Sequence, residues 1–284
     1  MAALPARTGV LGGGRMGAGI AHALLLAGCD VVVAESDATA AEAARARVLA
    51  ALRTSIDRGS TDRTLERLEG RLMVEIGPGS LSGCALVIEA VPEIAGLKAD
   101  VLGALDAILP AGAVIATNTS SMSIDELAAV TSRPSRFLGL HFFNPVPASQ
   151  LVEVVVGAAT DPALVDDARE WVAQLGKTAV VVRDAPGFAS SRLGIALGLE
   201  AVRMVEEGVA EPADIDAAMT LGYKHPVGPL RLTDIVGLDV RLDIADYLAT
   251  RLGPRFAAPD LLREKVARGE LGRKSGRGFY DWAD

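Results

Sequence analysis

The chain has 284 residues, half of them apolar, and a formal net charge of −8 from 28 lysines and arginines against 36 aspartates and glutamates. This length and composition predict one large or two ordinary folded domains and exclude a disordered chain. The net negative charge and the absence of a basic stripe argue against a nucleic-acid partner. The sequence has no apolar run of 18 or more residues, the length that a membrane span would need.

The first predicted elements are a strand, a glycine-rich turn, a helix and a second strand. A short apolar run at 8–11 precedes GGGRMG, an apolar segment at 18–27 has the length of a buried helix, and a β-branched run at 31–34 follows. A continuous β-branched run is typical of a parallel strand that is covered on both faces. Glu35 stands at its end.

This order of elements is the context in which a G-x-G-x-x-G sequence binds a dinucleotide. Gly12 permits the tight turn, Gly14 lets the backbone approach a pyrophosphate, and Gly17 lets the helix pack closely on the strand. The helix N-terminus offers N–H groups to the phosphates. Glu35 is placed to accept hydrogen bonds from a ribose 2′-hydroxyl and would repel a 2′-phosphate, so NAD is predicted rather than NADP. The alternative is a glycine turn in an α/β protein that binds no nucleotide.

Strands and helices continue to alternate up to residue 183. Residues 40–52 and 61–68 are expected as solvated helices. A phosphate-binding role for Arg45, Arg47, Arg53 and Arg58 is the less favoured interpretation. Further strands are expected at 85–88, 113–116, 137–140, 151–156 and 178–182, and further helices at 97–109, 124–130 and 165–175. Polar residues gather at the carboxyl ends of the strands, where open α/β sheets bind ligands. We therefore predict a Rossmann-type doubly wound α/β sheet over residues 1–183.

No alternating strand pattern returns after the sequence DAPG at 184–187. Helices are expected at 192–207, 212–220, 238–252 and 259–268. The sequence thus predicts a smaller all-α domain over residues 184–284, with Phe279, Tyr280 and Trp282 packing the C-terminus down.

The numbers and positions of the cysteines and histidines bear on the cellular compartment and on a possible metal site. Cys29 and Cys84 lie in apolar surroundings, as core cysteines of a reducing compartment do. The three histidines and two cysteines are too scattered for a metal site, so no metal is expected. The N-terminal sequence has no secretory pattern, and we expect a cytoplasmic protein.

Three polar residues at or near strand ends are candidates for chemistry beside a nucleotide. His141 suits proton transfer near neutral pH, Glu153 would fix its tautomer, and Ser120 would hold a substrate oxygen. Each also has a structural interpretation: a core histidine, a carboxylate paired with an arginine, and a serine that caps the following helix.

Five further strings follow the glycine motif in order: TNTSSMSI, LGLHFFNPVPASQLVEVV, DAPGFASSRLG, HPVGPLRLTDIVGLD and GRKSGRGFYDW. With that motif they resemble the L-3-hydroxyacyl-CoA dehydrogenase family, which includes the 3-hydroxybutyryl-CoA dehydrogenases, over essentially the whole chain. The resemblance implies reversible, NAD-dependent oxidation of a short-chain L-3-hydroxyacyl-CoA, such as 3-hydroxybutyryl-CoA, to the 3-ketoacyl-CoA.

The resemblance also implies roles for single residues. His141 looks like the general base that takes the proton from the substrate 3-hydroxyl, and Glu153 like its orienting carboxylate. Ser120 looks like the residue that hydrogen-bonds the reacting oxygen, and Asn144 like part of the active-site wall near the nicotinamide.

For the cofactor, the resemblance implies contacts on the nicotinamide side from Glu93 and Lys98 and a position near the ribose for Asn118. The full set of expected NAD contacts is Gly12, Gly14, Met16, Gly17, Glu35, Ala90, Glu93, Lys98, Asn118, Ser120 and Lys274. The helical domain is expected to complete the substrate cleft and to form a homodimer.

One position departs from the family pattern. Ser191 stands where the family has an asparagine that helps to bind substrate, and a serine hydroxyl reaches less far and has no amide carbonyl. Three alternatives therefore stay open: the same chemistry on a hydroxyacyl group linked to a carrier protein, the same chemistry on a free sugar acid such as gulonate, and an NAD-binding protein that is catalytically idle.

Overall fold

The computed structural model describes residues 2–282 and divides into two compact units, Met1–Asp184 and Ala185–Asp284. Each unit has its own apolar core. Among the described residues, no helix has the length and apolar character needed to cross a membrane.

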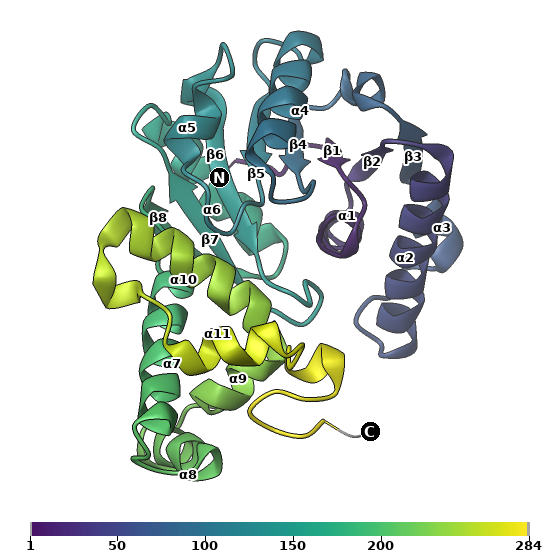
Figure 1. Ribbon diagram of the computed structural model, residues 1–284. Helices are drawn as coiled ribbons and strands as arrows, with labels where there is room; N and C mark the ends of the chain where they lie inside the picture. Colours follow the sequence, from purple (N-terminus) through teal and green to yellow (C-terminus); the bar gives the residue numbers. More distant parts are fainter. Residues whose placement is uncertain (1, 283–284) are drawn as a thin grey trace. The chain divides into compact units, whose positions relative to one another are not determined.

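The first unit is built on an eight-stranded sheet in the order β3-β2-β1-β4-β5-β6-β7-β8 (Figure 1). The strands are β1 (Arg7–Leu11), β2 (Asp30–Glu35), β3 (Leu72–Ile76), β4 (Leu86–Glu89), β5 (Val114–Thr117), β6 (Phe137–Phe142), β7 (Leu151–Val156) and β8 (Thr178–Arg183). Strands β1 to β6 are parallel, whereas β7 runs antiparallel to β6 and β8 runs parallel to β7. The predicted Rossmann-type sheet is confirmed, because 3-2-1-4-5-6 is the strand order of dinucleotide-binding folds.

This strand order places the ligand-binding edge of the sheet. The chain starts at β1, proceeds outward to β2 and β3, and then returns to β4 on the other side of β1. The helices that follow β1 and β4 therefore leave the sheet at a switch point, and the carboxyl ends of these two strands border it.

Six α-helices of the first unit connect or flank these strands: α1 (Arg15–Ala27), α2 (Ala38–Asp57), α3 (Leu65–Glu69), α4 (Ala95–Ile108), α5 (Ile124–Ala128) and α6 (Pro162–Gln174). Figure 1 shows α2 and α3 beside β2 and β3 at one end of the sheet. Helix α2 is preceded by the N-cap residue Asp37, whose carboxylate accepts a hydrogen bond of 2.8 Å from the Ala40 N–H. This N-cap explains why the helix starts directly after β2.

Strand β3 was not among the sequence predictions. It pairs with β2 along its whole length but forms the edge of the sheet, and Met73 and Ile76 are 46% and 57% exposed. Its sequence LMVEI is apolar at four of five positions, but only Leu72 is buried, and periodicity does not distinguish so short a run from the end of a helix. The predicted helix at 61–68 is correspondingly shorter, because α3 begins only after Thr64, whose hydroxyl caps it.

Helix α1 carries a buried histidine. His22 is 2% exposed, its Nε2 lies 2.8 Å from the Ser55 hydroxyl, and its Nδ1 has no hydrogen-bond partner among the described residues. Burial lowers the pKa of His22 to about 4, and the charge of Lys177 lowers it further in the same direction. The imidazole is therefore neutral in the folded protein at neutral pH.

We expect His22 to make the protein acid-sensitive. Because the folded pKa is about 4 and the unfolded pKa is 6.5, the unfolded chain binds this proton first as the pH falls. Stability is unaffected above pH 6.5 and decreases toward pH 4, by about 3 kcal/mol from this group. Urea unfolding of the wild type and of His22→Gln across this range measures the effect. The variant should lose that part of the pH dependence; an unchanged slope would contradict the assignment.

The second unit is helical, as predicted. Its helices are α7 (Ser190–Glu206), α8 (Pro212–Ala217), α9 (Pro229–Val236), α10 (Leu238–Leu252) and α11 (Asp260–Ala267). They enclose a core that includes Ile195, Leu199, Leu230, Leu248 and Leu262. Helix α9 was not predicted, because eight residues between Gly228 and Gly237 give too short a periodic pattern.

The C-terminal segment is fastened by Asp234 of α9, which is fully buried. Its carboxylate accepts hydrogen bonds from the backbone N–H groups of Phe279 and Tyr280, both at 2.9 Å, and from the Trp282 indole at 2.8 Å. The prediction that these aromatic residues pack the C-terminus down is confirmed. The two cysteines are both buried free thiols.

Candidate active site

The glycine turn between β1 and α1 fits a pyrophosphate. Gly12 has φ +91°, a conformation that side chains disfavour, and a Cβ at Gly17 would lie 1.7 Å from the Gly12 carbonyl oxygen. A Cβ at Gly14 would meet nothing within 4 Å. Within the described chain, no side chain caps α1 at Gly14 and no acidic residue lies in its first turn. The helix N-terminus therefore keeps the N–H groups and the positive field that suit phosphate oxygens.

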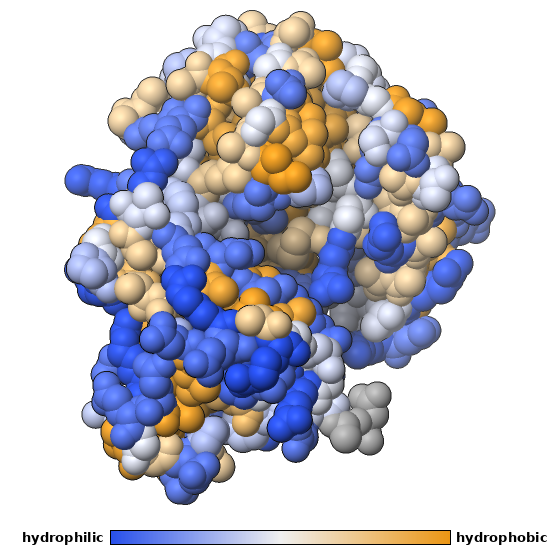
Figure 2. Space-filling model, viewed as in Figure 1, coloured by the Kyte–Doolittle hydropathy of each residue, from blue (hydrophilic) through white to orange (hydrophobic). Residues whose placement is uncertain are grey.

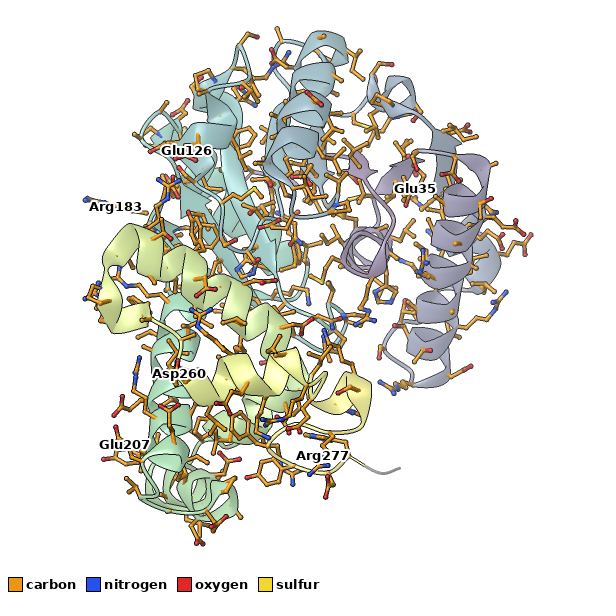
Figure 3. All side chains as sticks on the ribbon, in the orientation of Figure 1. Glu35, Glu126, Arg183, Glu207, Asp260 and Arg277 are labelled. Atoms are coloured by element: carbon orange, nitrogen blue, oxygen red, sulfur yellow. The ribbon has the colours of Figure 1, made fainter. Side chains whose placement is uncertain are left out.

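Glu35 is part of this turn as well as a candidate ribose ligand. It ends β2 (Figure 3), and its Oε1 accepts the Gly13 N–H at 2.6 Å, while Oε2 is 3.3 Å from the Ser36 N–H. Arg47 of α2 donates to the Gly13 carbonyl at 3.3 Å. The carboxylate thus holds the glycine turn and retains acceptor capacity for ribose hydroxyls.

The double role of Glu35 makes its two neutral variants informative. Glu35→Ala should raise the Kd of NADH about tenfold, because the acceptor for the ribose hydroxyl is lost. It should also reduce the preference for NADH over NADPH, because the negative charge that repels a 2′-phosphate is lost. Glu35→Gln keeps an acceptor for the Gly13 N–H and removes only the charge, so it should narrow the preference with a smaller loss of NADH affinity. Fluorescence titration with both nucleotides measures this. An unchanged preference in both variants would mean that another residue reads the ribose.

His141 and Glu153 form a buried pair in the sheet. They are direct partners in the antiparallel register of β6 and β7, which puts both side chains on the same face. The Nδ1 of His141 lies 2.8 Å from Oε2 of Glu153, and the two residues are 6% and 1% exposed. Since a carboxylate only accepts, Nδ1 carries the hydrogen, and Nε2 is the basic nitrogen of the ring. The Phe143 ring lies against the imidazole, with ring centroids 4.4 Å apart.

Asn118 connects the loop after β5 to the strand that carries His141. Its amide oxygen accepts the Phe142 N–H at 2.8 Å, one residue beyond His141. The loop continues into Thr119 and Ser120. This hydrogen bond holds Ser120 at the carboxyl end of the strand adjacent to His141.

Glu93 organises the loop that contains Ser120. Its Oε1 accepts the Ser120 N–H at 2.9 Å and the Thr119 hydroxyl, and the hydroxyls of Ser120 and Ser121 lie at 3.5 and 3.4 Å. Its Oε2 lies 3.3 Å from Nζ of Lys98. Of the sequence candidates, Glu93, Lys98 and Ser120 are thus brought into one cluster.

Glu89 is a member of this cluster that sequence reasoning missed. It is fully buried at the end of β4, and its carboxylate binds Nζ of Lys98 through both oxygens, at 2.7 and 2.9 Å. Lys98 itself is 1% exposed. The only sequence signal was an acid at a strand end with a lysine nine residues later, and many solvated pairs have such a spacing.

The other candidates lie as follows. Ala90 follows β4, and its carbonyl oxygen would be 3.0 Å from a Cβ on Gly12, so it borders the glycine turn. Met16 is half-buried in the first turn of α1. Asn144 is exposed after β6 and precedes a cis-proline. In the second unit, Ser191 is half-buried in the first turn of α7, and Lys274 pairs with Asp239.

Two family models match the chain. The NAD binding domain of 3-hydroxyacyl-CoA dehydrogenase matches residues 7–185, and the C-terminal domain of 3-hydroxyacyl-CoA dehydrogenase matches residues 187–282.

The chain belongs to the 3-hydroxyacyl-CoA dehydrogenase family.

Individual relatives agree with this family over nearly their full lengths. The chain is 42% identical over 277 residues to the probable 3-hydroxybutyryl-CoA dehydrogenase of Bacillus subtilis, covering 97% of this chain and 96% of that protein. It is 42% identical over 280 residues to the 3-hydroxybutyryl-CoA dehydrogenase of Mycobacterium tuberculosis, covering 97% and 98%. The crystal structure of (S)-3-hydroxybutyryl-CoA dehydrogenase from Ralstonia eutropha matches with a TM-score of 0.94 at 38% identity, over 99% of this chain and 100% of that one.

As a 3-hydroxyacyl-CoA dehydrogenase, the protein is an NAD-dependent oxidoreductase, and the predicted cofactor is confirmed. The family's NAD binding domain includes the glycine turn, Glu35 and the cluster around Glu93. The residues of the turn fit the dinucleotide, because the helix end is uncapped and the glycines leave the backbone accessible.

Proposed function

We propose that the protein catalyses the reversible, NAD-dependent oxidation of a short-chain L-3-hydroxyacyl-CoA, such as 3-hydroxybutyryl-CoA, to the 3-ketoacyl-CoA. The observation that carries the proposal is the buried hydrogen bond of 2.8 Å between His141 and Glu153, next to the loop with Ser120. The 3-hydroxybutyryl-CoA dehydrogenase activity named for the relatives supports the chain length.

In this proposal, each residue of the site moves or holds a specific atom. Nε2 of His141 takes the proton of the substrate 3-hydroxyl, and Glu153 stabilises the imidazolium that forms. The Ser120 hydroxyl hydrogen-bonds the oxygen on C3, and Asn144 forms part of the wall around the reacting atoms. Bound NAD supplies the hydride acceptor for C3. In the reverse direction the same nitrogen of His141 returns the proton.

The proposed NAD contacts are divided between the two ends of the dinucleotide. The pyrophosphate end is assigned to Gly12, Gly14, Met16, Gly17 and Glu35, and the nicotinamide end to Ala90, Glu93, Lys98, Asn118, Ser120 and Lys274. Since Lys98 is 1% exposed, its contribution there is its charge rather than a direct contact.

The experiment that tests this function is NADH oxidation by the purified protein with acetoacetyl-CoA. It is repeated with NADPH, with a free 3-keto acid and with an acetoacetyl ester of a carrier protein. Rapid turnover with NADH and the CoA ester alone is expected. Turnover of the free acid only, or of a carrier-protein ester only, would favour one of the alternative substrates. NADH binding without turnover of any of them would favour the idle NAD-binding protein.

Ser191 provides a separate test of the substrate. A serine can donate one hydrogen bond, whereas the family asparagine reaches further and offers both a donor and a carbonyl. If acyl-CoA is the substrate, Ser191→Asn should lower the KM for acetoacetyl-CoA or raise kcat. The expected increase in kcat/KM is about tenfold, which corresponds to the free energy of one or two hydrogen bonds. Steady-state kinetics measures this. An unchanged or decreased kcat/KM would indicate that Ser191 suits a different substrate.

We further propose that residues 1–183 bind NAD, and that residues 184–284 complete the substrate cleft and form a homodimer in the cytoplasm. The second unit leaves several large apolar side chains exposed, among them Leu193 at 71%, Leu221 at 82% and Tyr223 at 76%. Apolar patches interrupt the mainly hydrophilic surface on the visible face (Figure 2). Such surface favours association. Analytical ultracentrifugation tests the dimer, and a single species of monomer mass would contradict it.

A further inference from the structure

Glu89, Lys98 and Glu93 form a continuous series of contacts from the sheet to the loop that contains Ser120. We call these three side chains the relay, in the sense of transmitted position rather than of proton transfer. Its innermost member is Glu89, which faces Thr117 in the register of β4 and β5; both residues are fully buried. Both oxygens of Glu89 are used: Oε1 accepts from Lys98 and from the Val91 N–H at 2.7 Å each, and Oε2 accepts from Lys98 at 2.9 Å and from the Thr117 hydroxyl at 2.6 Å. Four hydrogen bonds fix this carboxylate: one comes from the neighbouring strand β5, one from the loop after β4, and two from Lys98 of α4.

Lys98 is the second member and joins two carboxylates. Its ammonium binds Glu89 at 2.7 Å and Glu93 at 3.3 Å and donates to the Val91 carbonyl at 3.3 Å. A buried ammonium needs a charged partner, and Glu89 supplies it inside the protein. Because Glu89 holds Lys98 in one position, Lys98 presents its charge to Glu93 at a fixed point.

Glu93 is the third member and the one that touches the loop. Its Oε2 faces Lys98 while its Oε1 accepts the Ser120 N–H at 2.9 Å and the Thr119 hydroxyl. The Thr119 hydroxyl in turn accepts the Met122 N–H at 3.0 Å. The path of contacts from Glu89 to the backbone of Ser120 is therefore continuous, and it passes through Lys98 and Glu93.

We propose that Glu89 is a positioning residue for the reaction: through Lys98 and Glu93 it sets the place of the Ser120 hydroxyl. The inference rests on the proposed function in one respect, the role of Ser120 at the reacting oxygen. Glu89 itself has no exposed surface, so we assign it no direct part in the reaction. A displacement of about 1 Å at a reacting group can cost about 100-fold in rate, so the relay is an effective control point.

The test is a double-mutant cycle of Glu89→Gln with Ser120→Ala, with kcat for acetoacetyl-CoA reduction as the readout. Glu89→Gln keeps the shape of the side chain and removes its charge. It should lower kcat about 10- to 100-fold in the wild-type background and by less than about threefold once Ser120 is alanine, because there is no hydroxyl left to position. Equal factors in both backgrounds, or a kcat within twofold of the wild type, would overturn the proposal.

A matched control lies on α4, the helix that carries Lys98. Asp106 of α4 forms a largely buried ion pair of 2.6 Å with Arg133 at the other end of the helix. Asp106→Asn removes a charge from a comparable pair but leaves the relay intact, so kcat should stay within about twofold of the wild type. If Glu89→Gln does not fold, Glu89→Asp, which keeps the charge but shortens the side chain toward Lys98 by one methylene, replaces it in the cycle with an expected effect of about threefold.

A substrate-independent measurement separates this inference from the proposed function. Amide hydrogen exchange at Ser120, whose N–H donates to Glu93, should be faster in Glu89→Gln and unchanged in Asp106→Asn. Unchanged exchange in Glu89→Gln would overturn the relay even if the enzyme is active. Faster exchange in a protein that does not reduce acetoacetyl-CoA would support the relay and count against the proposed substrate alone.

Discussion

Replacing His141 by alanine is expected to lower kcat for acetoacetyl-CoA reduction by roughly 10²- to 10⁴-fold, the usual contribution of a positioned general acid or base. His141 is 6% exposed and is held by a hydrogen bond of 2.8 Å to Glu153, so no solvent group can take its place in the same geometry. NADH affinity should change by less than about threefold, because the glycine turn and Glu35 lie at the ends of other strands. Single-turnover kinetics and NADH fluorescence measure the two quantities separately.

Glu153→Gln is the control that distinguishes a pair from two independent residues. The amide can still accept the hydrogen of Nδ1 but cannot stabilise the imidazolium, so kcat should fall by less than in His141→Ala. In the double variant the Glu153 change should add little, because residues that act as a unit are not additive. A His141→Ala enzyme that keeps more than a tenth of the wild-type kcat, or loses NADH binding instead, would contradict the assignment of the base.

The parts of the fold that bury the most apolar surface were predictable from sequence. Strands β1, β2 and β4 to β6 read as β-branched or apolar runs because both faces of a parallel sheet are covered. The edge strand β3 and the eight-residue helix α9 were missed, because a half-exposed strand and a two-turn helix leave only a few buried positions each. The antiparallel direction of β7 depends on how the eight-residue connection at 143–150 turns the chain back after β6, which the spacing of elements does not specify.

The residues of the candidate site also differ in how well the sequence predicts them. Gly12, Gly17 and Glu35 follow one another at a fixed spacing, and their chemistry is local to one β-α-β unit. The pairing of His141 with Glu153 depends on the register of two strands. Their positions at or near strand ends made both residues candidates, and the resemblance to a family favoured the pair over the structural interpretations. Glu89 could not be singled out, because its neighbours Thr117 and Lys98 are brought to it by the order of the strands and by the docking of α4.

A second large effect is expected at Asp234, this time on stability. Asp234→Ala removes the acceptor for three donors of the C-terminal segment, the N–H groups of Phe279 and Tyr280 and the indole of Trp282. A donor left without a partner inside a protein costs about 1–3 kcal/mol. Since the segment can partly detach and hydrate these donors, we expect a loss of about 3 kcal/mol in the free energy of unfolding. Urea denaturation measures the loss, and limited proteolysis should show earlier cleavage near the C-terminus.

Two variants sharpen this prediction. Asp234→Asn keeps one acceptor oxygen and should cost less than alanine. Asp281→Asn removes a carboxylate from the same segment, but its ion pair with Arg277 is 3.6 Å long and 84% exposed on the aspartate side, so less than about 0.5 kcal/mol should be lost. A loss below about 1 kcal/mol in Asp234→Ala would mean that the segment is held by its apolar contacts instead.

The same variant also tests whether the segment contributes to the active site. Lys274, a proposed NAD contact, lies in the loop that Asp234 fastens: a Cβ on Gly272 would come within 2.3 Å of the Asp234 carbonyl oxygen, and one on Gly278 within 2.2 Å of its carboxylate. If Lys274 contacts NAD, the looser loop of Asp234→Ala should raise the Kd of NADH, measured at a temperature at which the variant is still folded. Lys274→Met should raise this Kd by a similar factor. If NADH affinity is unchanged in both variants, the segment stabilises the helical unit and leaves the nucleotide to the first unit alone.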